Sequence, residues 1–345
     1  MLFSLKSAII KEKHAMRKKR YIMTEEKIRQ EEPMSAPPEK KEKPRVGEIG
    51  ENGYIVRKKR WGDRNDGRRL RTTPAMLKFM PYIMRDRSDA LNTFADSLDM
   101  TKTDPFCRRK VKEGKTNFTL LHILLAAYVR AISQKPGINR FIAGQRIYAR
   151  NDIEINMVIK RAMTLDSPDT VVTVHFLPTD TVDDVYEKFN RAVMENVREN
   201  DDNSFDKLNR ALVFIPGILI RAVVRLLFWA DYHGWLPRKL TMLSPFHGTM
   251  FITSMGSLGI PPIYHHIYNF GNLPAFLAYG TKRTEIYLDS EGNPKKRKMV
   301  DLKAVTDERI CDGFYYASAF KIIKKMVENP ELLETPPETV VEDID

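Results

Sequence analysis

The sequence has little cysteine and none of the spaced cysteine or histidine pairs that bind metal ions. Only Cys107 and Cys311 occur in 345 residues, and no CxxC pair is present, so neither a disulfide framework nor a zinc site is indicated. No HExxH or HxH pattern occurs either, which argues against a metal enzyme. This cysteine usage is typical of a reducing compartment, and we expect a cytoplasmic location.

The N-terminus lacks the features of a signal peptide, and the chain shows no internal repeat. The first apolar run, MLFSLKSAII, is interrupted by Lys6 and is followed by no small-residue cleavage site. Met23 is an alternative start of translation, which would make residues 1–22 an extension.

The longest apolar run, residues 211–230 (ALVFIPGILIRAVVRLLFWA), approaches the length of a membrane span. Arg221 and Arg225 lie four residues apart in it, and each would cost about 2.5–3.5 kcal/mol at the centre of a bilayer. Pro216 and Gly217 also interrupt the run. We therefore predict no transmembrane span but a buried or interfacial helix docked over the core, with a hydrophobic lid or a membrane-touching surface as the alternative.

Lys and Arg outnumber Asp and Glu, and most of this excess lies near the N-terminus. Residues 1–72 hold 21 Lys and Arg against 11 Asp and Glu, which accounts for most of the net charge of +12. Residues 24–46, rich in charge and proline, are typical of a disordered linker. We predict a basic, largely disordered arm over residues 1–52 and a single domain over residues 53–345. The arm carries no nucleic-acid motif, so it is either a solvated tail or a contact for an acidic partner or an anionic surface.

Beyond the arm, helical and strand patterns are mixed along the chain. Helical spacing occurs over residues 73–94, and residues 116–141 predict a buried helix with a Thr or Asn cap that ends at Lys135-Pro136-Gly137. Strands are predicted within 146–163, 171–178, 248–259, 273–283 and 299–309, and amphipathic helices over 179–200 and 314–334. This order predicts an α/β (α+β) two-layer sandwich.

Three C-terminal segments share a family pattern. FITSMGSLGI (251–260), NLPAFLAYG (272–280) and TDERICDGFYYASAFKIIKKMVENPELLE (306–334) resemble the end of the catalytic domain of dihydrolipoyl acyltransferases, the core subunits of 2-oxo acid dehydrogenase complexes. Chloramphenicol acetyltransferase is similar and shares that fold. In this superfamily the closing motif is a histidine, three residues, Asp-Gly and a helix. The resemblance extends more weakly back to about Pro74.

The resemblance implies a chloramphenicol-acetyltransferase-like fold, a homotrimer with active sites between subunits, and coenzyme A or acyl-CoA as a substrate. It also implies residue roles. Ser254, with Thr253 as its neighbour, is the candidate donor to the oxyanion of a tetrahedral intermediate. Asp312 is a structural anchor, with Arg85 or Arg87 as its partner.

Two further features bear on the resemblance: one agrees with the family pattern and the other departs from it. Gly313, beside the anchor, allows a close turn of the backbone. The lipoyl-bearing module of these acyltransferases, with its DK(A/V) turn, is absent from the sequence. This absence argues against a core subunit of a standard dehydrogenase complex.

The sequence departs from the family at Glu308, which occupies the position of the catalytic histidine. A carboxylate is a weaker base than an imidazole by about two pKa units, although burial can narrow this gap. A carboxylate beside a developing oxyanion is also electrostatically unfavourable. Two hypotheses follow: an acyltransferase in which Glu308 is an altered base, acting on an unknown acceptor, or a catalytically inactive trimeric scaffold or acyl-CoA-binding protein.

Other side chains could take part in such a site. His247 and the pair His265-His266 lie near Ser254 in the sequence and are candidates for binding substrate, although such histidines more often bond to backbone. Cys311 lies inside the Asp-Gly turn, where a buried and unreactive thiol is expected. His122, within an apolar helix, is expected to be a packing residue.

Overall fold

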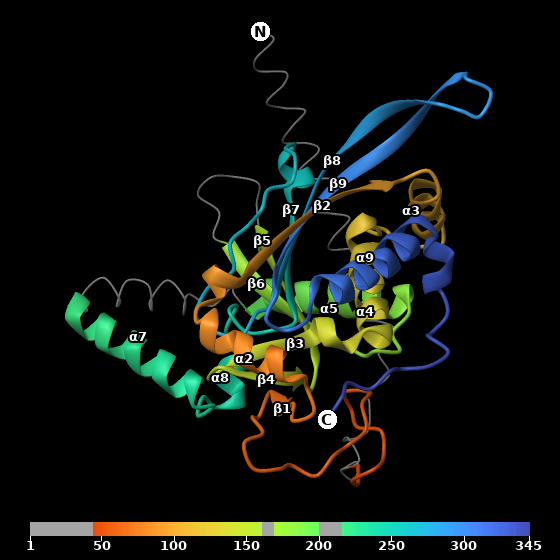
Figure 1. The fold of residues 1–345 in the computed structure, drawn as a ribbon. Helices are drawn as coiled ribbons and strands as arrows, with labels where there is room; N and C mark the ends of the chain where they lie inside the picture. Colours follow the sequence, from red (N-terminus) through yellow and green to blue (C-terminus); the bar gives the residue numbers. More distant parts are fainter. Residues whose placement is uncertain (1–43, 161–168, 200–215) are drawn as a thin grey trace. The chain divides into compact units, whose positions relative to one another are not determined.

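A mixed six-stranded β-sheet organises the chain, and helices cover one of its faces (Figure 1). The computed structural model describes residues 44–160, 169–199 and 216–345, and residues 45–345 form one compact unit. That unit begins before the predicted domain boundary at residue 53. The strand order is β2-β9-β8-β7-β5-β6. The strands of this sheet are β2 (Leu91–Asp99), β5 (Ile153–Lys160), β6 (Asp169–Phe176), β7 (Met250–Ser254), β8 (Ala275–Leu288) and β9 (Pro294–Asp307).

The centre of this sheet is apolar on both faces. β7 pairs in parallel with β5 and β8, whereas the other neighbours are antiparallel. Because successive side chains of a strand point to opposite faces, Met250 and Ile252 join the main core while Phe251 joins a second cluster with Phe276 and Val305. Successive residues of these strands are therefore apolar, as expected where both faces of a sheet are covered.

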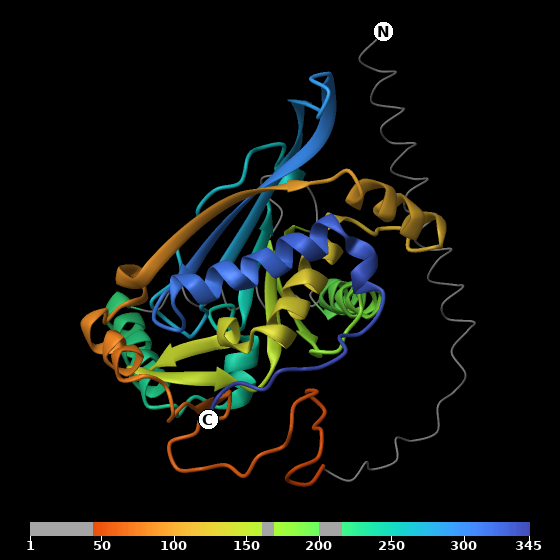
Figure 2. The ribbon, with the colours of Figure 1, turned by 45° about the vertical axis from the view of Figure 1, so that its right-hand side comes forward.

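The helical layer lies on the main-core face and consists of α4 (Leu120–Gln134), α5 (Val182–Glu199) and α9 (Gly313–Glu328), as Figure 2 shows. Every residue of α4 from Leu120 to Ser133 is buried. The helix begins at the predicted cap, because Thr119 and His122 form a reciprocal capping box. The α/β two-layer sandwich predicted from the sequence is thus the fold of the chain.

Several elements were missed from the sequence, two of them in one region. β2 (Leu91–Asp99) and α3 (Thr103–Lys112) occupy a region whose first part was predicted to be helical. α2 (Ala75–Ile83) accounts for the helical spacing and includes Pro81. β2 is an edge strand with many exposed residues, so it lacks the apolar pattern that marks the inner strands.

A smaller sheet, β1-β4-β3, lies beside the main one. Its strands are β1 (Gly67–Arg69), β4 (Arg146–Arg150) and β3 (Arg140–Ala143). The last residues of the chain run along this sheet, where Arg68 donates hydrogen bonds to the carbonyls of Ile344 (2.6 Å) and Asp343 (3.1 Å). β1 and the C-terminal segment are therefore held together although they are far apart in sequence.

The prediction of a docked helix over residues 211–230 is wrong for the part that the structure describes. Helix α7 (Gly217–Tyr232) is exposed along most of its length, and Ile218 is 75% exposed. Its one buried residue is Asp231, which pairs with Arg64 (2.8 Å). The helix is thus fixed to the rest of the fold near its C-terminal end, where Phe228 also packs against Phe270. Residues 211–215 lie outside the described part of the chain.

Among the described residues, no helix is both long and apolar enough to cross a bilayer. The short helix α8 (Arg238–Leu243) follows α7 and also exposes apolar side chains.

The buried side chain of His122 makes the stability of the fold depend on pH under acidic conditions. His122 packs against Phe118, Tyr186 and Phe189, and burial lowers its pKa from 6.5 to about 4. A group whose pKa is lower in the folded state stabilises the fold above the unfolded pKa, and this contribution disappears as the pH falls toward the folded value. The expectation that His122 is a packing residue is confirmed.

We therefore expect the free energy of unfolding to fall by up to about 3 kcal/mol between pH 6.5 and pH 4 because His122 must become charged. His122→Gln retains a side chain suited to the capping box and should flatten the pH dependence in this window. Urea unfolding at several pH values measures the effect, and His266→Gln, at an exposed site, is the control. Identical slopes for the wild type and His122→Gln would contradict the assignment.

Candidate active site

The turn between β9 and α9 is fixed by a buried carboxylate. Asp307 is fully buried and receives two hydrogen bonds from Arg309, from Nε to Oδ1 (2.8 Å) and from Nη2 to Oδ2 (2.7 Å). Arg87 approaches from the other side, with its Nε 3.4 Å from Oδ2. A bidentate guanidinium fixes the plane of a carboxylate as well as neutralising its charge, so the residue before Glu308 has a defined orientation.

Further bonds attach this turn to distant segments. Arg309 also donates through Nη1 to the carbonyls of Met84 (3.0 Å) and Arg85 (3.1 Å). The backbone N–H of Glu308 donates to the carbonyl of Ala90 (2.9 Å). These contacts leave the Glu308 backbone little freedom, while its side chain remains half-buried.

Asp312 has a different partner from the one predicted. It is exposed and caps α9, where its Oδ1 accepts a hydrogen bond from the Tyr315 N–H (2.8 Å). Arg87 faces Asp307, and the carbonyl of Arg85 accepts from Arg309. No ion pair of Asp312 occurs within the described ranges. The anchoring role that the family pattern suggested for Asp312 is filled here by Asp307, five residues earlier.

A cavity of about 540 Å³ opens beside Glu308. Its lining combines residues of the turn with the start of α2 and one arginine of β3: Pro74, Met76, Leu77, Met80, Arg140, Glu308, Cys311, Asp312, Gly313 and Tyr315. Three apolar side chains of α2 face a carboxylate across this space. Such a mixture suits a ligand with a flexible apolar chain and one reactive polar group.

Two groups of the lining are not free to react. Arg140 is held by Asp343, with Nε 2.7 Å from Oδ2 and Nη2 2.5 Å from Oδ1. Burial raises the pKa of the Cys311 thiol to about 12. The thiol therefore stays protonated at neutral pH and is a poor nucleophile, in agreement with the expectation for this cysteine.

Ser254 and Thr253 lie far from Glu308 within one chain. Ser254 pairs with Tyr279, and Tyr279 pairs with Leu302 in the neighbouring strand. Glu308 follows Leu302 by six positions, which corresponds to about 20 Å along a strand. Ser254 instead interacts with the buried hydroxyl of Tyr279, whose pKa is raised by burial. A single chain therefore does not bring the two predicted groups together.

The candidate histidines do not line the cavity at Glu308. His247 is buried, with Nδ1 2.8 Å from Ser244 Oγ and Nε2 3.4 Å from Asp231. His265 stacks on Phe276 with ring centroids 4.0 Å apart, and His266 is exposed next to it. In the described part of the chain, no group of three or more His, Cys, Asp or Glu could hold a metal ion.

Three residues of the site were missed from the sequence: Asp307, Arg309 and Arg140. The D-x-R spacing in DERICDG was a usable signal, because the two side chains are close enough in sequence to form a pair. Arg140 carried no such signal, since its partner is more than 200 residues away.

Part of the chain matches the model of a known protein family. Residues 238–335 match the family model described as 2-oxoacid dehydrogenases acyltransferase (catalytic domain). The matched segment includes Ser254, Glu308 and all of α9. The predicted resemblance to this family is confirmed for this part of the chain. No curated protein matches the chain.

Several solved structures are similar at low identity. A probable dihydrolipoamide acetyltransferase from Listeria monocytogenes 4b F2365 is 18% identical with a TM-score of 0.46, covering 76% of this chain and 95% of that one. The cubic core of the pyruvate dehydrogenase multienzyme complex is 16% identical with a TM-score of 0.45, covering 76% and 93%. A chloramphenicol acetyltransferase is 13% identical with a TM-score of 0.44, covering 76% and 98%.

The two aspartates of the turn should differ strongly in their effect on stability. We expect Asp307→Asn to lower the free energy of unfolding by about 3–5 kcal/mol, because it leaves two buried guanidinium groups without their carboxylate. Asp312→Asn should change it by less than about 0.5 kcal/mol, because Asn caps helices as well as Asp does. Urea denaturation followed by circular dichroism compares them. Similar losses for both variants would show that Asp307 does not anchor the turn.

Proposed function

We propose that the protein is a CoA-dependent acyltransferase-like protein in which Glu308 replaces the usual histidine base. The observation that carries this proposal is the half-buried Glu308 carboxylate, fixed by the Asp307–Arg309 turn at the edge of a 540 Å³ cavity within the segment that matches the catalytic-domain model. The acyl group and the acceptor are left open.

In the proposed reaction, Glu308 takes the proton of an acceptor thiol, alcohol or amine as that group attacks the thioester carbonyl. A tetrahedral oxyanion forms, and the Ser254 hydroxyl donates a hydrogen bond to it. The carbon–sulfur bond then breaks, and the CoA thiolate recovers the proton from Glu308. The methionine side chains of α2 would contact the apolar part of acyl-CoA and exclude water.

This chemistry needs a second copy of the chain, because Ser254 and Glu308 are separated within one copy. We propose a homotrimer whose sites lie between subunits, with Glu308 of one subunit facing Ser254 of the next. The surface around the cavity is consistent with an interface: Phe314 is 87% exposed, Met76 69% and Phe79 58%. Exposed apolar groups of this size commonly mark contact surfaces.

The first test is turnover of acetyl-CoA and longer acyl-CoAs with thiol, amine and alcohol acceptors. If Glu308 is the base, Glu308→Gln should lower kcat about 100-fold or more, which is the usual contribution of a general base. Glu331→Gln removes the same charge at an exposed position beyond α9 and should leave kcat unchanged. Unchanged turnover in Glu308→Gln would rule out the altered-base mechanism.

A second test asks whether the site is shared between subunits. Ser254→Ala and Glu308→Gln chains, refolded together in equal amounts, should recover about a quarter of wild-type activity, since three of four trimers are mixed and each mixed trimer regains one intact site of three. Each variant refolded alone is the control. No recovery in the mixture would place both groups in one chain or exclude one of them from the reaction.

The alternative function is an acyl-CoA-binding or scaffold protein without turnover. The substitution at Glu308 favours it, because a carboxylate cannot accept and donate through two opposite nitrogens as imidazole does. Equilibrium binding distinguishes the alternatives: acyl-CoA that binds to wild type and Glu308→Gln equally, with no product formed by either, supports the scaffold. Residues 1–43 of the basic arm lie outside the described residues, and an acidic partner or anionic surface for the arm is a separate proposal.

A further inference from the structure

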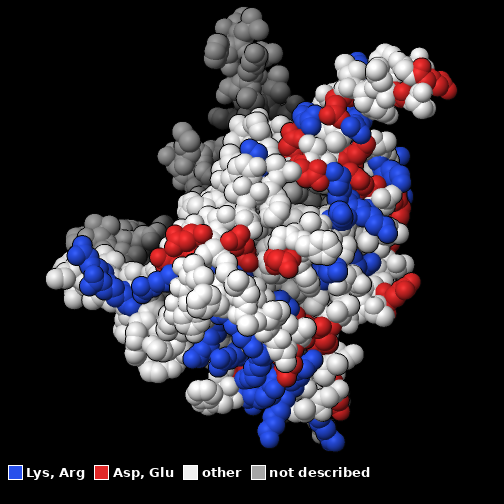
Figure 3. All heavy atoms as spheres, in the orientation of Figure 1, with Lys and Arg blue, Asp and Glu red and all other residues white. Residues whose placement is uncertain are grey.

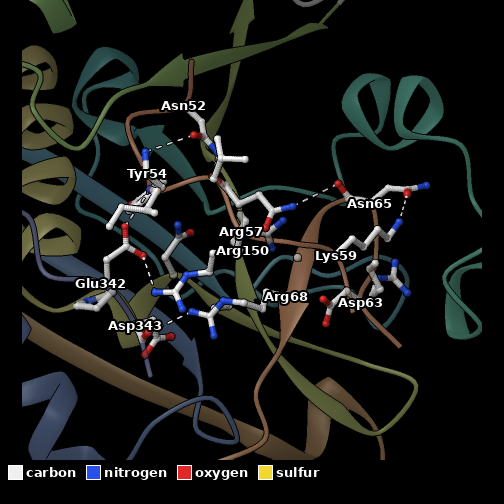
Figure 4. Close-up of a pocket in the computed structure, with 18 of the residues that line it drawn as sticks. Asn52, Tyr54, Arg57, Lys59, Asp63, Asn65, Arg68, Arg150, Glu342 and Asp343 are labelled. Carbon is white, nitrogen blue, oxygen red and sulfur yellow. Dashed lines mark hydrogen bonds and ion pairs between the residues drawn. The ribbon is translucent and has the colours of Figure 1, made fainter. Parts of the chain in front are cut away.

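A second cavity lies away from Glu308, between the segment that precedes β1, the β1–β4 pair and the C-terminal segment (Figure 4). Its volume is about 350 Å³, within the range of small-molecule sites. None of the residues that line it lines the cavity at Glu308. We call it the basic cavity because of its charges.

Cations outnumber carboxylates in its lining. The cations are Arg57, Lys58, Lys59, Arg64, Arg68 and Arg150, and the carboxylates are Asp63, Glu342 and Asp343. Asp63 and Asp343 are already engaged by arginines, Arg71 (3.0 Å) and Arg140 (2.5 Å) respectively. Figure 3 shows Lys and Arg gathered over the lower end of this face, where Figure 1 draws the segment that leads into β1. Arg64 and Arg68 also have carboxylate partners outside the lining. The remaining cations, Arg57, Lys58, Lys59 and Arg150, still outnumber Glu342, so the lining keeps an excess of positive charge.

Two cations of this lining, Arg57 and Lys58, are exposed and are not held by strong internal bonds. Arg57 lies 3.6 Å from Glu342, which is too long for a hydrogen bond. Lys58 makes no hydrogen bond or ion pair within the described ranges. By contrast, Arg64 and Arg68 are held by internal hydrogen bonds. Arg57 and Lys58 are thus available to a ligand without breaking a strong internal pair.

Arg150 lines the basic cavity and has buried donors without hydrogen-bond partners. Arg150 is only 7% exposed, and its Nη2 donates to the carbonyl and the side-chain oxygen of Asn272, both at 3.0 Å. Its Nε and Nη1 have no hydrogen-bond partner in the described structure. Phe141 packs under the guanidinium at 4.5 Å. Burial lowers the pKa of Arg150 to about 10, so it stays charged at neutral pH.

Buried unpaired donors are costly, and a bound ion or ligand is one explanation for a native structure that keeps them. Neutral groups complete the lining: Asn52, Asn139 and Asn151 supply amides, and Tyr54 and Val56 supply apolar surface. Guanidinium groups are suited to phosphate because they form two parallel hydrogen bonds with it. The excess of cations favours an anion with more than one charge.

We propose that the basic cavity binds a small molecule bearing phosphate or pyrophosphate groups, with Arg57, Lys58 and Arg150 as its cationic contacts. The site is separate from the proposed acyl transfer, although one link joins them: Asp343 lines the basic cavity and pairs with Arg140, which lines the cavity at Glu308.

Isothermal titration calorimetry on the full chain, without any acyl-CoA, tests the proposal with inorganic phosphate, pyrophosphate, ATP and succinate as probes. We expect saturable binding of pyrophosphate or ATP, tighter than that of succinate. The Arg57→Ala/Lys58→Ala pair should weaken binding about tenfold or more, because charge-assisted hydrogen bonds are lost. The Lys112→Ala/Lys321→Ala pair removes two exposed lysines on α3 and α9 and should bind as wild type does.

The remaining outcomes separate the sources of the anion or reject the site. Tighter binding of ATP than of pyrophosphate would identify a nucleotide, and equal binding would identify the pyrophosphate group alone as the ligand. The proposal fails if no phosphate compound saturates the protein, if succinate binds as tightly as pyrophosphate, or if both variant pairs weaken binding equally. Arg150→Lys, which keeps the charge but loses the planar donors, should also weaken binding while the melting temperature confirms that it folds.

Discussion

The Asp307–Arg309 pair, with Arg87 beside it, is the interaction on which the candidate site depends. It lies where the longest pair of strands ends and the last helix begins, and Arg309 extends it to the carbonyls after α2. Burying these charges is favourable only because nearly all their hydrogen-bonding groups are satisfied. The resulting rigidity fixes the Glu308 backbone while leaving its side chain toward the cavity. A reactive carboxylate needs this combination of a fixed backbone and an accessible oxygen.

The same geometry explains why the proposed acyl transfer needs a second copy of the chain. The strand register separates Ser254 from Glu308 along the sheet, and no side-chain motion of ordinary size closes about 20 Å. The exposed apolar groups near the cavity and along α7 are a second sign that surfaces of this chain meet another surface. The basic cavity, in contrast, is formed within one chain by segments from its two ends, so its proposed ligand requires no second copy.

Much of the fold could be predicted because its core elements have strong local patterns. The buried helix α4 and the inner strands follow directly from apolar spacing. The edge strand β2 could not be predicted, since its polar face leaves no alternation to recognise. Helix α7 was misread because its composition is that of a buried helix, whereas burial depends on what lies beside it. The DERICDG turn identified the site, but assigning Asp312 as the anchor required a partner that sequence spacing cannot supply.

The sequence by itself determined the class of fold, the acyltransferase-like turn and the acidic residue at its centre, because these are properties of short contiguous segments. Only the tertiary structure decided which carboxylate is clamped by arginines, that Ser254 lies far from Glu308, and that Arg150 is buried with unused donors beside Arg57 and Lys58. The physical reason is the same in each case. Burial and charge pairing are set by residues tens to hundreds of positions apart, and their energies exist only once the chain has brought them into contact.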